Sequence, residues 1–188
     1  KTIAGQSIVH GLHSFLWMLE CLIQREESVF INYDIRFANQ INLEQEVSAI
    51  WNRESKELKL LGKNDLIYIS VKCEDPTSCG VIANKTSPVT LSNTITQPTD
   101  LDLSAVSVGD TFENLCGGNK ELATSLFPYL TEALGGDVVY EIALLSSIVG
   151  MIVPGLNSLF FGLKITFKHG ADNQIVTVNS KQELFRLI

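Results

Sequence analysis

The feature that most constrains the fold of this chain is an apolar helix without a clearly polar face. Between Leu12 and Ile23, apolar residues recur at the i, i+3, i+4 and i+7 spacing of an α-helix. Trp17 and Met18 extend the apolar character around most of the helix circumference. A helix of this kind is buried on most of its sides. The rest of the chain must therefore supply a layer that covers it.

Strand-like alternation begins directly after this helix. From Val29 to Phe37, apolar and polar residues alternate, which is the period of a half-buried β-strand. Further strands are predicted at 47–53, 57–61 and 65–73, with a turn at 62–64. The order is a helix followed by an antiparallel meander, and we expect the sheet to curl around the helix. The predicted fold class is α+β.

The C-terminal half repeats this layout. Residues 122–134 and 138–151 have helical patterns, separated by two glycines, and a strand with Phe161 on its apolar face follows at 158–167. Its sequence, SLFFGLKITF, matches SVFINYDIRF at 28–37 in Ser, Phe, Ile and Phe, at a constant offset of 130 residues. Because a long apolar helix precedes each strand, we expect a structural repeat.

A change of composition separates the two copies. Between residues 83 and 107, Ser, Thr, Asn, Asp and Pro dominate, as is typical of a linker. We therefore expect a first unit at 1–82, a linker at 83–121 and a second unit at 122–188. The chain begins at Lys1 and ends within an apolar alternation, so the first unit is expected to be incomplete at its N-terminus and the second at its C-terminus.

Composition argues against several classes of partner. The net charge of −7 repels a polyphosphate backbone, so no nucleic acid is expected. Polar residues, glycine and proline interrupt the apolar stretches at 142–153 and 156–163, and neither approaches the roughly 20 residues of a membrane span. No zinc spacing, P-loop or dinucleotide motif occurs, so neither a metal nor a cofactor is expected.

The four cysteines form no C-x-x-C pair, which favours a reducing, cytoplasmic setting. Cys73 and Cys79 flank a turn-rich segment and could pair in an oxidising compartment, although two cysteines near one turn are more often coincidence.

Three segments carry a resemblance to a known family. KTIAGQSIVHGLHSFLWMLECL at 1–22 resembles the MaoC-like hotdog hydratases and dehydratases, whose central helix follows an apolar-His-Gly step, here Val9-His10-Gly11. FINYDIRFANQINLEQEVSA at 30–49 is similar to that family's second strand, turn and third strand, and 146–167 is similar to its helix end, Pro-Gly turn and strand. The resemblance implies a double hotdog, in which each unit is an apolar helix wrapped by an antiparallel sheet.

The family resemblance also implies an activity. It suggests a hydro-lyase that acts as a dehydratase or enoyl hydratase on acyl thioesters of coenzyme A or an acyl carrier protein, as in fatty acid or polyketide metabolism, with a homodimer as one expected assembly. The same fold hosts other thioester chemistry, so a thioesterase, acyltransferase or decarboxylase and a non-catalytic acyl-binding or assembly module remain alternatives. The family's catalytic Asp, followed five positions later by a His, is not found here. We expect that this Asp and His pair either lies before Lys1 or is not used by this protein.

Three residues at the helix start are the predicted catalytic group. The Gly11 amide is expected to stabilise charge on the thioester oxygen, because the first amides of a helix have no intrahelical partner. The alternative is that Gly11 only permits a tight turn. His10 and His13 flank the same helix start and could act as neutral hydrogen-bonding groups, or be structural. For substrate contact we expect Ser14, Trp17 and Asn157; Asn157 and the nearby Ser146 could line a tunnel or form local caps.

Overall fold

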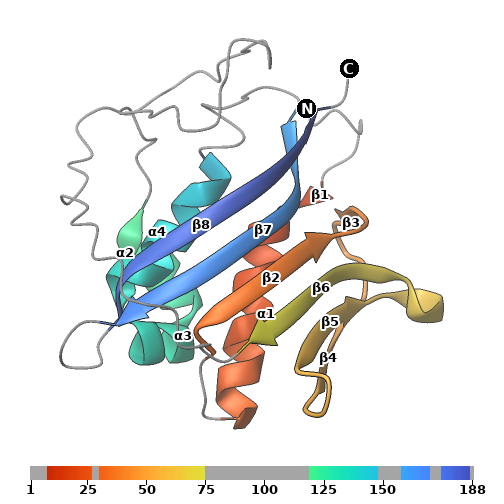
Figure 1. The fold of residues 1–188 in the computed structure, drawn as a ribbon. Coiled ribbons are helices and arrows are strands. Elements are labelled where there is room, and N and C mark those ends of the chain that lie inside the picture. The colour runs from red at the N-terminus through yellow and green to blue at the C-terminus, as the bar shows by residue number, and fades with distance from the viewer. Residues whose placement is uncertain (1–7, 27–29, 75–118, 148–157, 170–174, 187–188) are drawn as a thin grey trace.

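The computed structural model describes residues 8–26, 30–74, 119–147, 158–169 and 175–186 (Figure 1). Within them a layer of helices packs on one face of an antiparallel sheet, which confirms the α+β class. Most of the predicted linker lies outside the described residues.

The elements follow one another in two groups along the chain. The first comprises β1 (Ile8–Val9), α1 (Gly11–Glu26), β2 (Asn32–Phe37), β3 (Ile41–Asn42), β4 (Ser48–Asn52), β5 (Glu57–Leu61), a short 3-10 helix η1 (Lys63–Asp65) and β6 (Ile67–Glu74). The second comprises α2 (Lys120–Leu126), α3 (Pro128–Leu134), α4 (Gly136–Ser147), β7 (Ser158–His169) and β8 (Ile175–Arg186). The predicted helix at 12–23 and the predicted strands of the first half are confirmed.

The main sheet joins the two halves of the chain. Its six strands have the order β4-β5-β6-β2-β7-β8, and β1 pairs separately with β3. Strand β2 lies between β6 of its own half and β7 of the other half, antiparallel to both. The two helix-plus-strand groups are therefore hydrogen-bonded edge to edge through β2 and β7.

The pairing of β2 with β7 fits the offset of 130 residues. Asp34 lies opposite Lys164, and these two residues occupy equivalent positions of the two matching segments. The Lys164 Nζ atom lies 3.0 Å from Asp34 Oδ2, so the equivalent residues also form an ion pair. A local two-fold axis that relates the two strands therefore passes through the Asp34–Lys164 pair, near the middle of β2.

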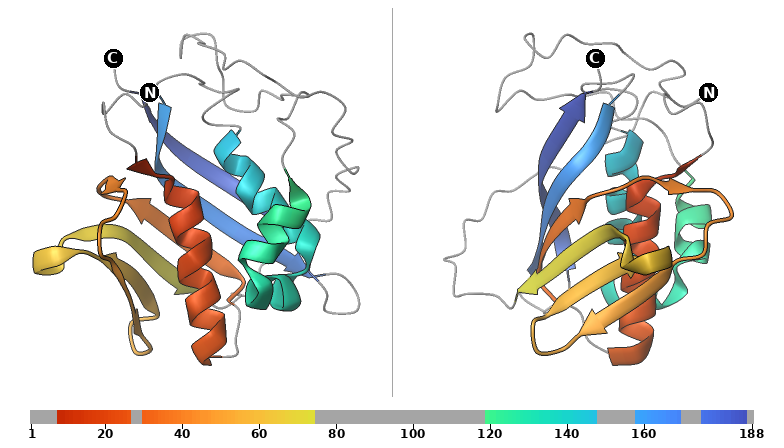
Figure 2. Two further views of the ribbon diagram at one scale, coloured as in Figure 1. Left: turned by 180° about the vertical axis from the view of Figure 1, so that it is seen from behind. Right: turned by 90° about the vertical axis from the view of Figure 1, so that its right-hand side faces the viewer.

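Helix α1 lies at the centre of the hydrophobic core. Figure 2 shows the β4–β6 end of the sheet curving around α1, while α4 lies over β7 and β8. On its other side α1 packs against α3 and α4. Buried side chains from both halves form one continuous cluster, whose largest fully buried members include Tyr68, Phe15, Phe167, Leu12, Leu16 and Met18. Among the large apolar side chains of α1, Trp17 is the exception, because it is 38% exposed.

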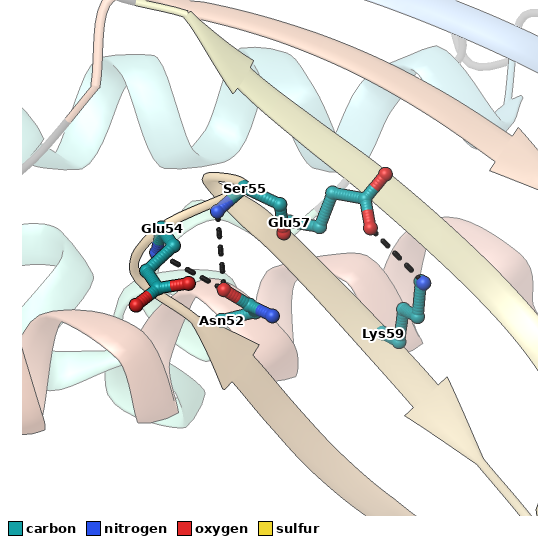
Figure 3. Close-up of polar contacts among 5 residues, drawn as sticks. All are labelled: Asn52, Glu54, Ser55, Glu57 and Lys59. Carbon is teal, nitrogen blue, oxygen red and sulfur yellow. Dashed lines mark hydrogen bonds and ion pairs between the residues drawn. The ribbon is translucent and has the colours of Figure 1, made fainter.

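The hairpin between β4 and β5 shows how the surface charges of the first half are arranged (Figure 3). Asn52 Oδ1 accepts hydrogen bonds from the backbone N–H groups of Glu54, at 3.0 Å, and Ser55, at 3.1 Å, and so stabilises the turn. The Lys59 ammonium lies 3.0 Å from the carboxylate of Glu57. Acidic side chains thus interleave with the basic ones on this hairpin.

Two local predictions were wrong. The single helix predicted at 122–134 is divided into α2 and α3 at Phe127, because Pro128 starts α3 and cannot continue a preceding helix. Phe161 was expected to face the core, but it is 53% exposed. The β7–β8 register shifts between Phe160 and Gly162, and such a bulge re-aims the adjacent side chain.

No helix in the described part of the chain combines the length and the apolar content needed to cross a bilayer.

Candidate active site at the start of helix α1

A pocket of about 200 Å³ lies at the start of α1, between α1, α2 and α4. Its wall is mostly apolar, and the polar groups that reach it come from four residues: His10, His13, Asn119 and Ser146. The apolar lining residues are Leu12, Leu16, Leu122, Ala123, Leu126, Phe127 and Ala143. An apolar cavity with a few convergent polar groups is typical of small-ligand sites.

His10 is placed by the start of the helix itself. The strand pair β1–β3 holds the preceding residue, Val9, opposite Ile41. His10 is then the N-cap: its carbonyl oxygen accepts from the Ser14 N–H at 3.1 Å, and its Nδ1 atom accepts from the Leu12 N–H at 3.4 Å. A side chain that accepts from one of the first helical amides satisfies a group that has no intrahelical partner.

This cap favours one tautomer of His10. A ring nitrogen that accepts a hydrogen bond carries no proton, so the neutral ring carries its proton on Nε2. Burial lowers the pKa of His10 below its ordinary value of 6.5, and the neighbouring His13 lowers this pKa further. At neutral pH, His10 is therefore an uncharged ring with Nε2–H as its donor.

His13 lies one turn further along α1 and borders the same pocket. Its ring packs against the ring of Phe127, with 5.4 Å between the centroids and an interplanar angle of 60°. Phe127 is buried, so one side of the His13 ring rests on a fixed apolar surface. The structure thus brings together the two histidines that the sequence singled out.

Gly11 lies beside the pocket rather than in its lining. A Cβ atom at this position would lie 2.7 Å from Cδ1 and 2.9 Å from Cε1 of Phe37. The absence of a side chain therefore allows the end of β2 to approach the start of α1. This contact gives Gly11 a packing role, and the oxyanion role of its amide stays a prediction.

The predicted substrate-binding residues lie in different places. Ser14 is buried, and its hydroxyl donates to the His10 carbonyl oxygen at 3.4 Å, so its hydrogen bond is local. Trp17 is not part of the pocket lining. Asn157 lies outside the described residues. Ser146, by contrast, lines the pocket as anticipated.

The sequence did not predict that α2 and Phe127 form one wall of the pocket. Glu20 of α1 positions the end of this wall, because its two carboxylate oxygens accept from Tyr129 N–H at 3.0 Å and Leu130 N–H at 2.7 Å. These are first-turn amides of α3, so a carboxylate from α1 caps α3 directly after Phe127. The only local sign of such a helix start is Pro128.

No group of three or more His, Cys, Asp or Glu side chains that could hold a metal ion occurs among the described residues. No protein-family model matches the chain, and no curated protein matches it. Among solved structures, the chain is similar to the tesB protein of Mycobacterium avium subspecies paratuberculosis. The TM-score is 0.43 and the identity 12%, over 100% of this chain and 90% of the other.

Proposed function

We propose that this chain is a MaoC-like double-hotdog protein that binds an acyl thioester and interconverts its 3-hydroxyacyl and enoyl forms. The observation that carries this proposal is the apolar pocket bordered by His10 and His13 at the start of the buried helix α1. The fold supports it in two ways: antiparallel strands curve around α1, and the matching strands β2 and β7 pair edge to edge.

Enoyl hydration requires a base that accepts a proton from water and a donor that stabilises charge on the thioester oxygen. The two histidines fit these two roles. As water adds to C3, its proton passes to a ring nitrogen of His13, and the electrons of the C2–C3 double bond move towards the thioester oxygen. The Nε2–H of the neutral His10 donates to that oxygen and stabilises its developing negative charge. His13 then returns the proton to C2. Dehydration is the same sequence in reverse.

The apolar lining contributes by holding the acyl chain beside these groups. The packing of Phe127 on His13 fixes the orientation of the proposed base against the bound chain.

The test is a spectrophotometric assay of crotonyl and longer enoyl thioesters, of coenzyme A and of an acyl carrier protein. His10→Asn keeps an N-cap acceptor for Leu12 but removes the Nε2–H donor, and His13→Asn removes the base. We expect each variant to lower kcat by about 100-fold or more, because general acid–base and oxyanion groups contribute this much. His169→Asn, at the end of β7, is the matched control and should leave kcat unchanged.

Three outcomes would contradict parts of the proposal. Activity that survives both substitutions at His10 and His13 would assign the chemistry to other residues. Loss of the enoyl-thioester absorbance that is matched by release of free thiol would favour a thioesterase that uses the same pocket, because hydrolysis of the thioester also removes this absorbance. Binding of acyl thioesters without any turnover would favour an acyl-binding module.

A further inference from the structure

The size of the pocket limits what it can hold. An apolar cavity of about 150 Å³ accommodates benzene, so the pocket of about 200 Å³, which is partly open to solvent beside Leu122 and Leu126, covers roughly six to eight carbon atoms. We propose that the site takes short acyl chains, up to about eight carbons, and that Ala143 on α4 sets this limit. This inference rests on the proposed function, since it names the substrate class of the same pocket.

The depth of the pocket along α1 agrees with a short chain. The lining residues His10, His13 and Leu16 follow one another at three-residue spacing on one side of the helix. The six residue steps from His10 to Leu16 span roughly 9 Å along the helix axis. His10 lies at one end of this span, His13 near its middle and the aliphatic side chain of Leu16 at the other end.

Helix α4 forms the opposite wall and runs antiparallel to α1 (Figure 2). This direction places Ser146 nearer to the start of α1 than Ala143, which lies one helical turn away on the same side. The polar hydroxyl is therefore at the histidine end, where a 3-hydroxyl group would lie. The small methyl group of Ala143 is at the end where the chain would terminate.

Two of the side chains that line the pocket cannot easily yield. Leu16 and Phe127 are 2% and 4% exposed and belong to the central core. Moving either side chain to admit a longer chain would disrupt close packing throughout this cluster. Ala143 itself packs against the same core, so a larger residue there extends into the pocket.

The experiment measures binding and does not depend on turnover. S-alkyl pantetheines carry the arm common to coenzyme A and acyl carrier proteins, and calorimetric titration with the ethyl, butyl, hexyl, octyl and dodecyl thioethers gives an affinity for each length. Affinity should rise about three- to fourfold for each buried methylene up to hexyl or octyl and should gain nothing further at dodecyl.

Substitutions on α4 and α3 then test the role of Ala143. Ala143→Leu should weaken hexyl binding about tenfold while leaving ethyl binding nearly unchanged, because the added carbons occupy the end of the pocket. Ala133→Leu, at an exposed position of α3, is the matched control and should reproduce the unmodified length profile. Ala123→Leu on α2 narrows the same pocket and replaces Ala143→Leu if that variant does not fold.

Separate results overturn separate claims. Affinity that keeps rising through dodecyl, or an Ala143→Leu profile equal to that of Ala133→Leu, overturns the length limit and leaves acyl binding intact. Failure to bind a thioether of any length overturns the proposed function, and the limit with it.

Discussion

A double-mutant cycle between Gly11 and Phe37 tests the packing at the start of α1. A Cβ at Gly11 would lie 2.7 Å from Phe37 Cδ1, whereas carbon atoms in favourable contact are about 3.5–4.0 Å apart. In Gly11→Ala the ring must therefore withdraw by roughly 1 Å. Insertion of one extra carbon into a packed contact costs about 1–3 kcal/mol. Phe37 is only half-buried, so the lower part of this range is expected.

In the Phe37→Ala background, we expect Gly11→Ala to stabilise the protein instead of destabilising it. With the ring removed, Gly11→Ala meets none of its close contacts and gains helix propensity, which is worth up to about 1 kcal/mol in a helix interior and less at its first residue. The coupling between the two sites should therefore be about 1–3 kcal/mol. Urea denaturation of the four proteins, followed by circular dichroism with unchanged m-values, measures it.

The cycle also separates the two roles of Gly11. Alanine keeps the backbone N–H, so if this amide contacts the substrate, the double variant should retain activity in proportion to its folded fraction. A coupling energy within 0.5 kcal/mol of zero would refute the packing argument, since that is the ordinary error of additivity. Stabilisation by Gly11→Ala in the unmodified protein would refute it as well.

The remaining predictions concern Glu20, His10 and Cys73. Glu20→Ala should destabilise the fold by about 2 kcal/mol in thermal or urea unfolding, because it removes two hydrogen bonds from the start of α3. Glu20→Gln should lose less stability. An equal loss of stability in the exposed control Glu132→Ala would contradict this prediction. Because the folded-state pKa of His10 is lowered from 6.5, the unfolded chain binds more protons just below that pH. The contribution of His10 to stability is thus complete above pH 6.5 and is lost as the pH falls through its folded-state pKa, and His10→Asn should flatten that part of the measured stability profile. Burial raises the pKa of the Cys73 thiol to about 12, so iodoacetamide at neutral pH should label it, by peptide mass spectrometry, only after denaturation; equally fast labelling of the folded protein would argue against a buried thiol.

The sequence by itself determined the elements that depend on local periodicity. The spacing of apolar residues located α1, and alternation located β2, β4, β5 and β6, because each side chain's direction follows from the period of its own backbone. The offset between 28–37 and 158–167 predicted a structural repeat, and the structure shows that strands from these two segments pair with each other. The sequence placed His10 at the helix start, and the structure adds that its ring caps the helix.

Only the tertiary structure decided what each buried face packs against. Periodicity did not reveal that Glu20 caps α3, since these partners are 109 and 110 residues apart. It also did not reveal the bulge that exposes Phe161, or the approach of Phe37 that requires a glycine at position 11. The pocket itself combines α1 with α2 and α4, which are distant in sequence. The physical reason is that apolar burial is non-directional: a pattern shows that a side chain leaves water, whereas its neighbours depend on how the whole chain packs.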